Sequence, residues 1–147
     1  MTVTATRRAL SILLVDDDPG DVLMIQEALE ASDATRDVNV VNDGDDALAY
    51  LRRLEPFTAA TRPDVMLLDL NMPRMSGHEV LAEVKADEDL RSIPVVILTT
   101  SQAPADVRES YIRHANAYVT KPINLDDLMD VVGRINDFFG RIAVLPD

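Results

Sequence analysis

The strongest constraint on the fold is the alternation, five times along the chain, of a short apolar run with a segment of helical periodicity. The first run, residues 10–15, is continuous and rich in branched side chains, which is typical of a strand buried on both faces. This alternation predicts an α/β fold in which a doubly wound parallel sheet has helices on both faces and right-handed crossovers. The predicted strands cover residues 10–15, 38–41, 65–68, 94–98 and 117–119.

The length of 147 residues predicts one domain with a core of its own. We expect this domain to cover residues 9–139, between a flexible tail at 1–8 and a C-terminal extension at 140–147. Residues 55–63 form a predicted loop that is longer than most connections in such a fold.

Composition excludes several classes of function. The chain has no cysteine, so disulfides, thiolate metal sites and cysteine nucleophiles are excluded. A formal net charge of -12 argues against nucleic acid and against an anionic membrane surface as partners. The sequence has neither an apolar run of membrane-spanning length nor a signal peptide, so the cytoplasm is the default compartment.

Polar residues gather where the predicted strands end. Asp16 and Asp17 follow the first strand, Asp69 follows the third, Thr99 follows the fourth, and the fifth leads to Lys121. In a parallel sheet these ends meet at one edge, which carries the functional crevice. Clustered carboxylates repel one another unless a cation binds, and Mg²⁺ prefers oxygen ligands. The acids alone would also be compatible with a purely structural cation site.

Lys121 and Thr99 favour phosphoryl chemistry over a structural cation site. A phosphoryl group in transfer has three equatorial oxygens whose charge must be compensated. Mg²⁺ can bind one, Lys121 another, and the Thr99 hydroxyl or a backbone N–H the third. Asp69 can then attack phosphorus and form an acyl phosphate, which is covalent catalysis by a carboxylate.

Four motifs in this order resemble the response-regulator receiver domains of two-component signalling. They are residues 12–17 (ILLVDD), 67–73 (LLDLNMP) with Gly77, 98–100 (LTT) and 118–122 (YVTKP). The resemblance covers nearly the whole chain and implies a flavodoxin-like (βα)5 fold with strand order 2-1-3-4-5.

The resemblance also implies a metal site around a phosphoacceptor. It identifies Asp69 as the phosphoacceptor. Mg²⁺ would be bound directly by Asp17, largely through water by Asp16, and by the backbone carbonyl of Asn71.

A switch is implied by the same resemblance. Thr99 and Tyr118 resemble the switch pair, and Lys121 the lysine that senses the phosphoryl group. Relatives have a cis peptide bond at the position of Lys121–Pro122. Phosphorylation would change the surface formed by the helix at 103–114, the fifth strand and the last helix.

The resemblance implies a sensor histidine kinase as the phosphodonor. The segments 18–21 (DPGD) and 137–146, together with the loop at 55–63, are similar to single-domain regulators that serve phytochromes, so a phytochrome is the candidate kinase. Output would be by protein contact. The apolar residues Phe138, Phe139 and Ile142 favour a partner or a homodimer, which would form through the same switch surface. On this interpretation the protein is not an enzyme.

Two other functional classes remain open. One is an aspartyl-nucleophile, Mg²⁺-dependent phosphatase, although such enzymes usually carry the nucleophile on the first strand and have a cap domain. The other is a binding module without chemistry, which the presence of the acids, Thr99 and Lys121 disfavours. Asp18 is interpreted as a helix cap or an outer-shell group of the metal site and not as a ligand, and His78 and His114 as exposed helix residues.

Overall fold

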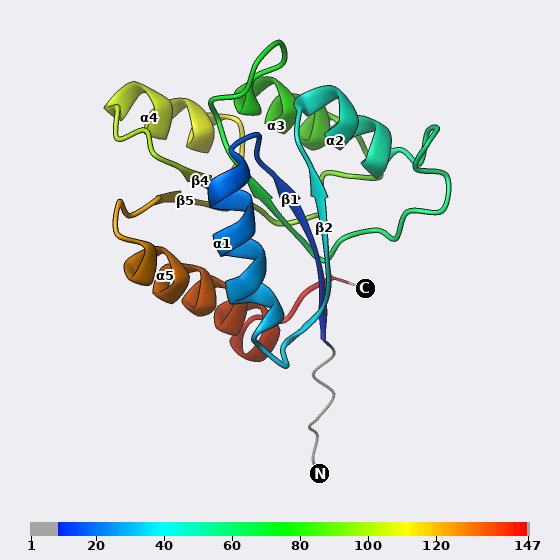
Figure 1. Cartoon of the computed structure of the whole chain (residues 1–147). Coiled ribbons are helices and arrows are strands. Elements are labelled where there is room, and N and C mark those ends of the chain that lie inside the picture. Colours follow the sequence, from blue (N-terminus) through cyan, green and yellow to red (C-terminus); the bar gives the residue numbers. More distant parts are fainter. Residues whose placement is uncertain (1–8, 147) are drawn as a thin grey trace.

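The computed structural model describes residues 9–146 and contains a five-stranded parallel sheet with the order β2-β1-β3-β4-β5 (Figure 1). This is the predicted flavodoxin-like order, so the predicted fold is confirmed. β3 pairs in parallel with β1, so the third strand lies beside the first. The strands are β1 Leu10–Val15, β2 Thr35–Val41, β3 Val65–Leu68, β4 Val95–Thr99 and β5 Ala117–Thr120.

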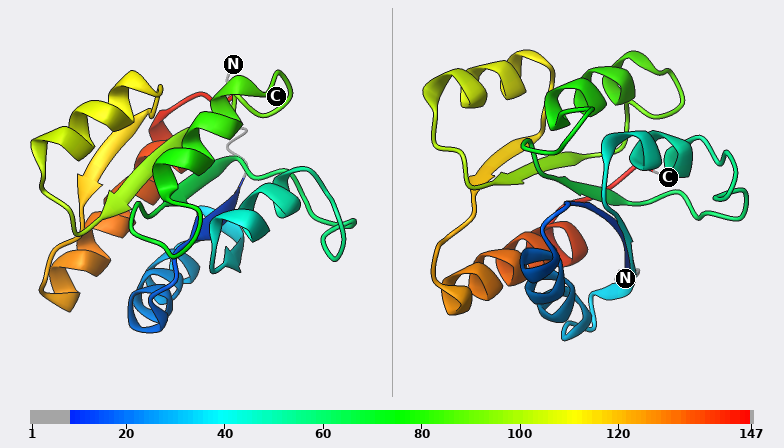
Figure 2. Two further views of the ribbon diagram at one scale, coloured as in Figure 1. Left: turned by 90° about the horizontal axis from the view of Figure 1, so that it is seen from above. Right: turned by 45° about the horizontal axis from the view of Figure 1, so that its top comes forward.

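Helices cover both faces of the sheet. α1 and α5 lie on one face, and α2, α3 and α4 lie on the other (Figure 2). Within residues 9–146, no helix combines the length and the apolar character that crossing a membrane would require. The helices are α1 Pro19–Glu30, α2 Gly44–Leu51, α3 Gly77–Ala86, α4 Pro104–Ile112 and α5 Leu125–Asp137, followed by the π-helix η1 Phe138–Ile142.

The three central strands are buried on both faces because their side chains alternate between two cores. In β1, Leu13 and Val15 pack in the core under α2 and α3. Ile12 and Leu14 pack in the core under α1 and α5. Full burial of one such side chain stabilises the fold by about 1.5–3 kcal/mol. The continuous apolar runs that identified the strands are therefore a direct consequence of two-sided burial.

The helices differ in how firmly they are anchored. The Asp18 side chain caps α1, as predicted, and Ser76 forms a capping box with Glu79 at the start of α3. In contrast, α4 begins at Pro104 without a side-chain cap, and the only residue it buries fully is Ser110. Few buried apolar contacts indicate an element of low local stability.

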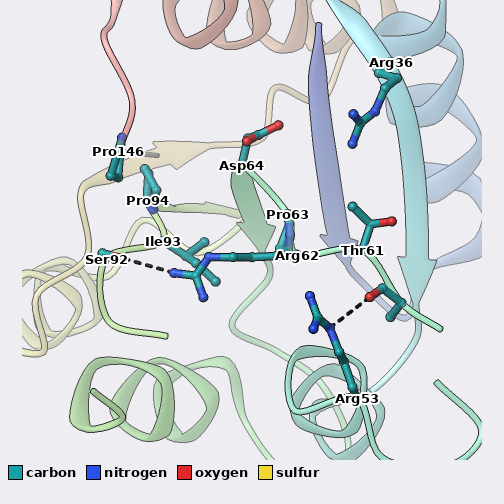
Figure 3. A pocket seen from close by; sticks show the side chains of 11 residues that line it. Arg36, Arg53, Thr61, Arg62, Pro63, Asp64, Ser92, Ile93, Pro94 and Pro146 are labelled. Carbon is teal, nitrogen blue, oxygen red and sulfur yellow. Dashed lines mark hydrogen bonds between the residues drawn. The ribbon is translucent and has the colours of Figure 1, made fainter. Parts of the chain in front are cut away.

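The loop at 55–63 is braced at the amino ends of the strands, next to a pocket of about 440 Å³ (Figure 3). Arg53 donates from Nε to the carbonyl oxygen of Ala60 at 3.1 Å. Arg62 donates to the carbonyl oxygen of Asp89 at 2.6 Å and to the hydroxyl of Ser92 at 3.0 Å. Arg53 thus ties the long loop to the end of α2, and Arg62 ties it to the α3–β4 connection, at the end of the sheet opposite the predicted site.

The C-terminal segment packs back on the domain. α5 continues into η1, in which Gly140 lies so close to Ala34 that a Cβ on Gly140 would stand 2.9 Å from the Cβ of Ala34. Phe139 and Leu145 pack against the core under α1 and α5. The predicted boundary between residues 139 and 140 falls inside η1 and stays a prediction, and the predicted tail at 1–8 lies outside the described residues.

We predict that Gly77→Ala lowers the free energy of unfolding by about 1–3 kcal/mol, because overpacking forces the backbone to shift. A Cβ at Gly77 would lie 2.2 Å from the carbonyl oxygen of Asp69. Gly133→Ala is the control, because a Cβ there would have no neighbour within 4 Å. In this control the free energy of unfolding should rise by about 0.5–1 kcal/mol. The measurement is urea unfolding followed by circular dichroism. Equal stability of the Gly77 variant and the wild type would contradict the prediction.

Candidate functional site

The predicted site residues are fixed by backbone hydrogen bonds to neighbouring strands. Asp16 donates its N–H to the last carbonyl oxygen of β2 at 3.2 Å, and Asp69 donates to the last carbonyl oxygen of β1 at 3.0 Å. Lys121 donates its N–H to the carbonyl oxygen of Thr99 at 2.7 Å. The position at which each strand leaves the sheet is therefore set by the neighbouring strand. As a result, the side chains that follow the strands converge on one edge of the sheet.

Three carboxylates meet at this edge. One oxygen from each of Asp16, Asp17 and Asp69 lies within 4.8 Å of the others. Asp16 and Asp69 are buried, whereas Asp17 is exposed. A set of carboxylate oxygens that is open to solvent on one side suits a hard divalent cation that retains some of its waters. The donor set therefore fits a divalent metal.

The Lys121 ammonium lies among these acids. Its Nζ is 2.7 Å from Asp16 Oδ2, 2.8 Å from Asp21 Oδ2 and 3.3 Å from Asp69 Oδ2, and the side chain is 3% exposed. An ammonium has three N–H donors, so these three acceptors use all of them. The Lys121 ammonium is therefore buried, and each of its N–H groups faces a carboxylate.

Burial and pairing act on the pKa values in different ways. Burial raises the pKa of Asp16 above its ordinary value, although the hydrogen bonds from Lys121 and from the Asp18 N–H oppose this. Burial alone would lower the pKa of Lys121, but the hydrogen bonds to Asp16 and Asp21 outweigh it and raise this pKa. Lys121 is therefore firmly charged at neutral pH, as a group that compensates phosphoryl oxygens must be.

Asp21 is the site residue that the sequence interpretation missed. Its carboxylate contacts Lys121 directly. A helical side chain points back toward the helix N-terminus, and Asp21 lies in the first turn of α1. That direction is the signal that could have placed Asp21 beside the acid pair.

Thr99 and Tyr118 are linked through Ser101 rather than directly. The buried Thr99 accepts at Oγ1 from the Ser101 N–H at 3.4 Å. The Tyr118 hydroxyl donates to the Ser101 carbonyl oxygen at 2.9 Å, with its ring packed against the core under α2 and α3. Both predicted switch residues thus hold the backbone of the same residue, at the start of the β4–α4 loop.

A chain of hydrogen bonds continues from Ser101 into α4 and α3. Ser101 donates from Oγ to Asp106 Oδ2 at 2.5 Å, and the Ser110 hydroxyl donates to the Asp106 carbonyl oxygen at 2.8 Å. His78 Nε2 lies 3.1 Å from Ser110 Oγ. His114 is exposed as predicted, but it lies after the end of α4 and not in the helix. The same prediction for His78 was wrong, because α4 lies against α3 and half-buries this ring.

Two implications of the resemblance concern the backbone. The Asn71 N–H lies 3.5 Å from Asp69 Oδ1, and its carbonyl oxygen as a metal ligand stays a prediction. The expectation of a cis Lys121–Pro122 bond was wrong: between residues 9 and 146 the cis peptide bond is Glu55–Pro56. The trans isomer is the one favoured for X–Pro bonds generally, and with it Lys121 reaches all three carboxylates.

We predict that Lys121→Met lowers the free energy of unfolding without metal by about 3–5 kcal/mol, because it leaves buried carboxylates without their counter-charge. The measurement is urea unfolding in the presence of a chelator. The control, Arg134→Met, removes a cation that is 80% exposed and should cost less than about 1 kcal/mol. Similar losses in both variants would show that the buried pairing does not stabilise the fold.

Comparison with known proteins gives relatives of the same length and fold. Over 135 residues the chain is 43% identical to "Response regulator Rcp1" of Synechocystis sp., covering 92% of each protein. The structure of the "Phosphorylated Cyanobacterial Phytochrome Response Regulator RcpA" is 45% identical, with a TM-score of 0.91 and coverage of 95% of this chain and 99% of that one. The "Mn(2+)-bound form of response regulator Rcp1" is 43% identical, with a TM-score of 0.85 and coverage of 94% and 99%.

The family model described as "Response regulator receiver domain" matches residues 12–133. This range includes the acid pair, Asp69 directly after β3, and Lys121. The divalent cation carried by the Rcp1 structure agrees with the donor set of the carboxylate cluster. The chain therefore belongs to the response regulator receiver domains, a family of phosphoacceptor signalling proteins.

Proposed function

We propose that Asp69 accepts a phosphoryl group from the phosphohistidine of a sensor histidine kinase, in a reaction that requires Mg²⁺. The observation that carries the proposal is the position of Asp69, with Oδ2 beside the Lys121 ammonium and its carboxylate within the acid cluster. An oxygen of Asp69 attacks phosphorus, the P–N bond of the phosphohistidine breaks, and the donor imidazole keeps the electron pair.

The residues of the site have separate roles in this transfer. Asp16 and Asp17 would hold the Mg²⁺ with Asp69 and with the carbonyl oxygen of Asn71, and the ion would neutralise phosphoryl charge. Lys121 supplies a second positive charge on the same side. The Leu70 N–H donates to Asp69 Oδ1 at 2.7 Å and holds the carboxylate plane in place. A structural cation site would have no use for such a lysine.

We further propose that phosphorylation acts on the surface formed by α4, β5 and α5 through Thr99 and Tyr118. A phosphoryl oxygen on Asp69 would accept a hydrogen bond from the Thr99 hydroxyl, whose oxygen now accepts from the Ser101 N–H at 3.4 Å. Movement of this hydroxyl toward the phosphoryl group would break its bond with Ser101 and change the loop that Tyr118 and Asp106 hold. Among the five α-helices within residues 9–146, α4 buries the fewest residues, so a local charge change can shift it at low cost.

The kinase that we propose is a phytochrome, and the compartment is the cytoplasm. The support for a phytochrome is the similarity to RcpA, which is described as a cyanobacterial phytochrome response regulator. With a net charge of -12, neither nucleic acid nor an anionic membrane is a proposed partner. No feature of the described site specifically favours the phosphatase alternative.

We predict that acetyl phosphate with Mg²⁺ adds one phosphoryl group to the wild type, and that Asp69→Asn reduces this labelling to background. The amide cannot form an acyl phosphate. Intact-protein mass spectrometry measures the label, and a chelator should abolish it. Asp45→Asn, which changes an exposed acid at the start of α2, is the control and should label like the wild type. Full labelling of Asp69→Asn would exclude Asp69 as the acceptor.

We also propose a homodimer through the α4-β5-α5 surface. Large apolar side chains are exposed there: Tyr111 and Ile112 at the end of α4, and Ile123 and Leu125 at the start of α5. Several large apolar side chains exposed on one surface favour a protein partner there. Because the surface includes the helix that phosphorylation would shift, self-association should depend on the state of Asp69.

The prediction is that beryllofluoride with Mg²⁺ raises the sedimentation mass of the wild type, and that Ile123→Glu prevents the increase. Ile123 is fully exposed, so the substitution should leave the fold intact while placing a charge in the interface. Leu54→Glu is the control because Leu54 is exposed in the loop at the other end of the molecule. An unchanged mass of the wild type on addition of beryllofluoride would count against a phosphorylation-dependent dimer.

A further inference from the structure

Asp21 contacts the lysine of the site from a helix that contributes no other predicted site residue. Asp21 Oδ2 lies 2.8 Å from Lys121 Nζ, almost as close as Asp16 Oδ2 at 2.7 Å. Its backbone is fixed, because its N–H donates to the capping oxygen of Asp18 at 3.1 Å. The carboxylate is therefore held in position by the same cap that starts α1.

The three acceptors of Lys121 are not equivalent. Asp16 and Asp69 belong to the carboxylate cluster whose geometry suits a divalent cation, whereas Asp21 does not. A cation bound to this cluster draws on the lone pairs of Asp16 and Asp69 and so weakens their bonds to the ammonium. The bond to Asp21 is independent of that competition.

We infer that Asp21 is a positioning residue that keeps the Lys121 ammonium at the site when a cation engages Asp16. With one N–H held by Asp21, the ammonium can direct another to a phosphoryl oxygen on Asp69. Asp21 is not part of the carboxylate cluster and does not contact the reacting atoms. It acts through Lys121. The inference rests on the proposed function of Asp69 and assigns to α1 a part in the chemistry of the site.

The test compares Asp21→Ala, which removes the acceptor, with Asp21→Asn, which keeps an acceptor oxygen but removes the charge. Titration of Mg²⁺ by calorimetry gives the cation affinity, and titration of beryllofluoride at saturating Mg²⁺ by fluorine NMR gives the affinity for the phosphoryl mimic. Glu27→Ala removes a charge from an exposed position of the same helix and is the control. It should behave like the wild type in both titrations.

If Asp21 positions the lysine, Asp21→Ala weakens beryllofluoride binding about tenfold or more, as loss of a hydrogen bond between charged groups would. Asp21→Asn should lie between this variant and the wild type. The Mg²⁺ affinity should change by less than about threefold, since the cation ligands remain. A parallel loss of both affinities would overturn the inference, because Asp21 would then act on the cation.

A second measurement needs neither cation nor beryllofluoride. In the presence of a chelator, Asp21→Ala should lower the free energy of unfolding in urea when it is introduced into the wild type. It should not lower it when it is introduced into the Lys121→Met variant, because the Asp21 carboxylate acts through the Lys121 ammonium. Equal destabilisation in both backgrounds would overturn the inference, since it would indicate a structural role in α1. If the wild type itself forms no beryllofluoride adduct, the proposed function fails. If the wild type and Asp21→Ala bind it equally, only the role of Asp21 fails.

Discussion

The buried ammonium of Lys121 is the charge on which the arrangement of the site depends. Its Nζ contacts carboxylates that follow β1, belong to α1 and follow β3. Without it, two buried acids would face each other with no counter-charge, which is costly in an environment of low dielectric. The lysine thus stabilises the fold and the site at once.

The parallel sheet places the functional site at one end of the strands and the contacts that hold the long loop at the other end. All strands point in one direction, so the acids, Thr99 and Lys121 collect at the carboxyl ends. At the amino ends, Arg53 and Arg62 bind backbone carbonyl oxygens and hold the long loop at 55–63 (Figure 3). The carboxyl-end loops have an accessible acid, Asp17, and lead to the weakly anchored helix α4. The loop held by the two arginines and the site with its accessible acid therefore lie at opposite ends of the same strands.

Much of the fold and the site could be predicted because the signals are local. Continuous apolar runs such as 65–68 identify buried strands, and residues directly after such runs must lie at the edge of the sheet. The position of Asp21 could not be found in this way, because it depends on how closely α1 approaches Lys121 from across the sheet. The partial burial of His78 could not be predicted for a similar reason, since it depends on the packing of α4 on α3.

The sequence by itself determined the order of the elements, the two-sided burial of the central strands, and the identity of the acids at the strand ends. Apolar periodicity and chain direction are enough for these, because they depend on neighbours along the chain. Only the tertiary structure decided which carboxylates share the Lys121 ammonium and which residues connect Thr99 to α4. Hydrogen bonds between side chains reach about 3 Å, so small differences in helix position decide which partners meet.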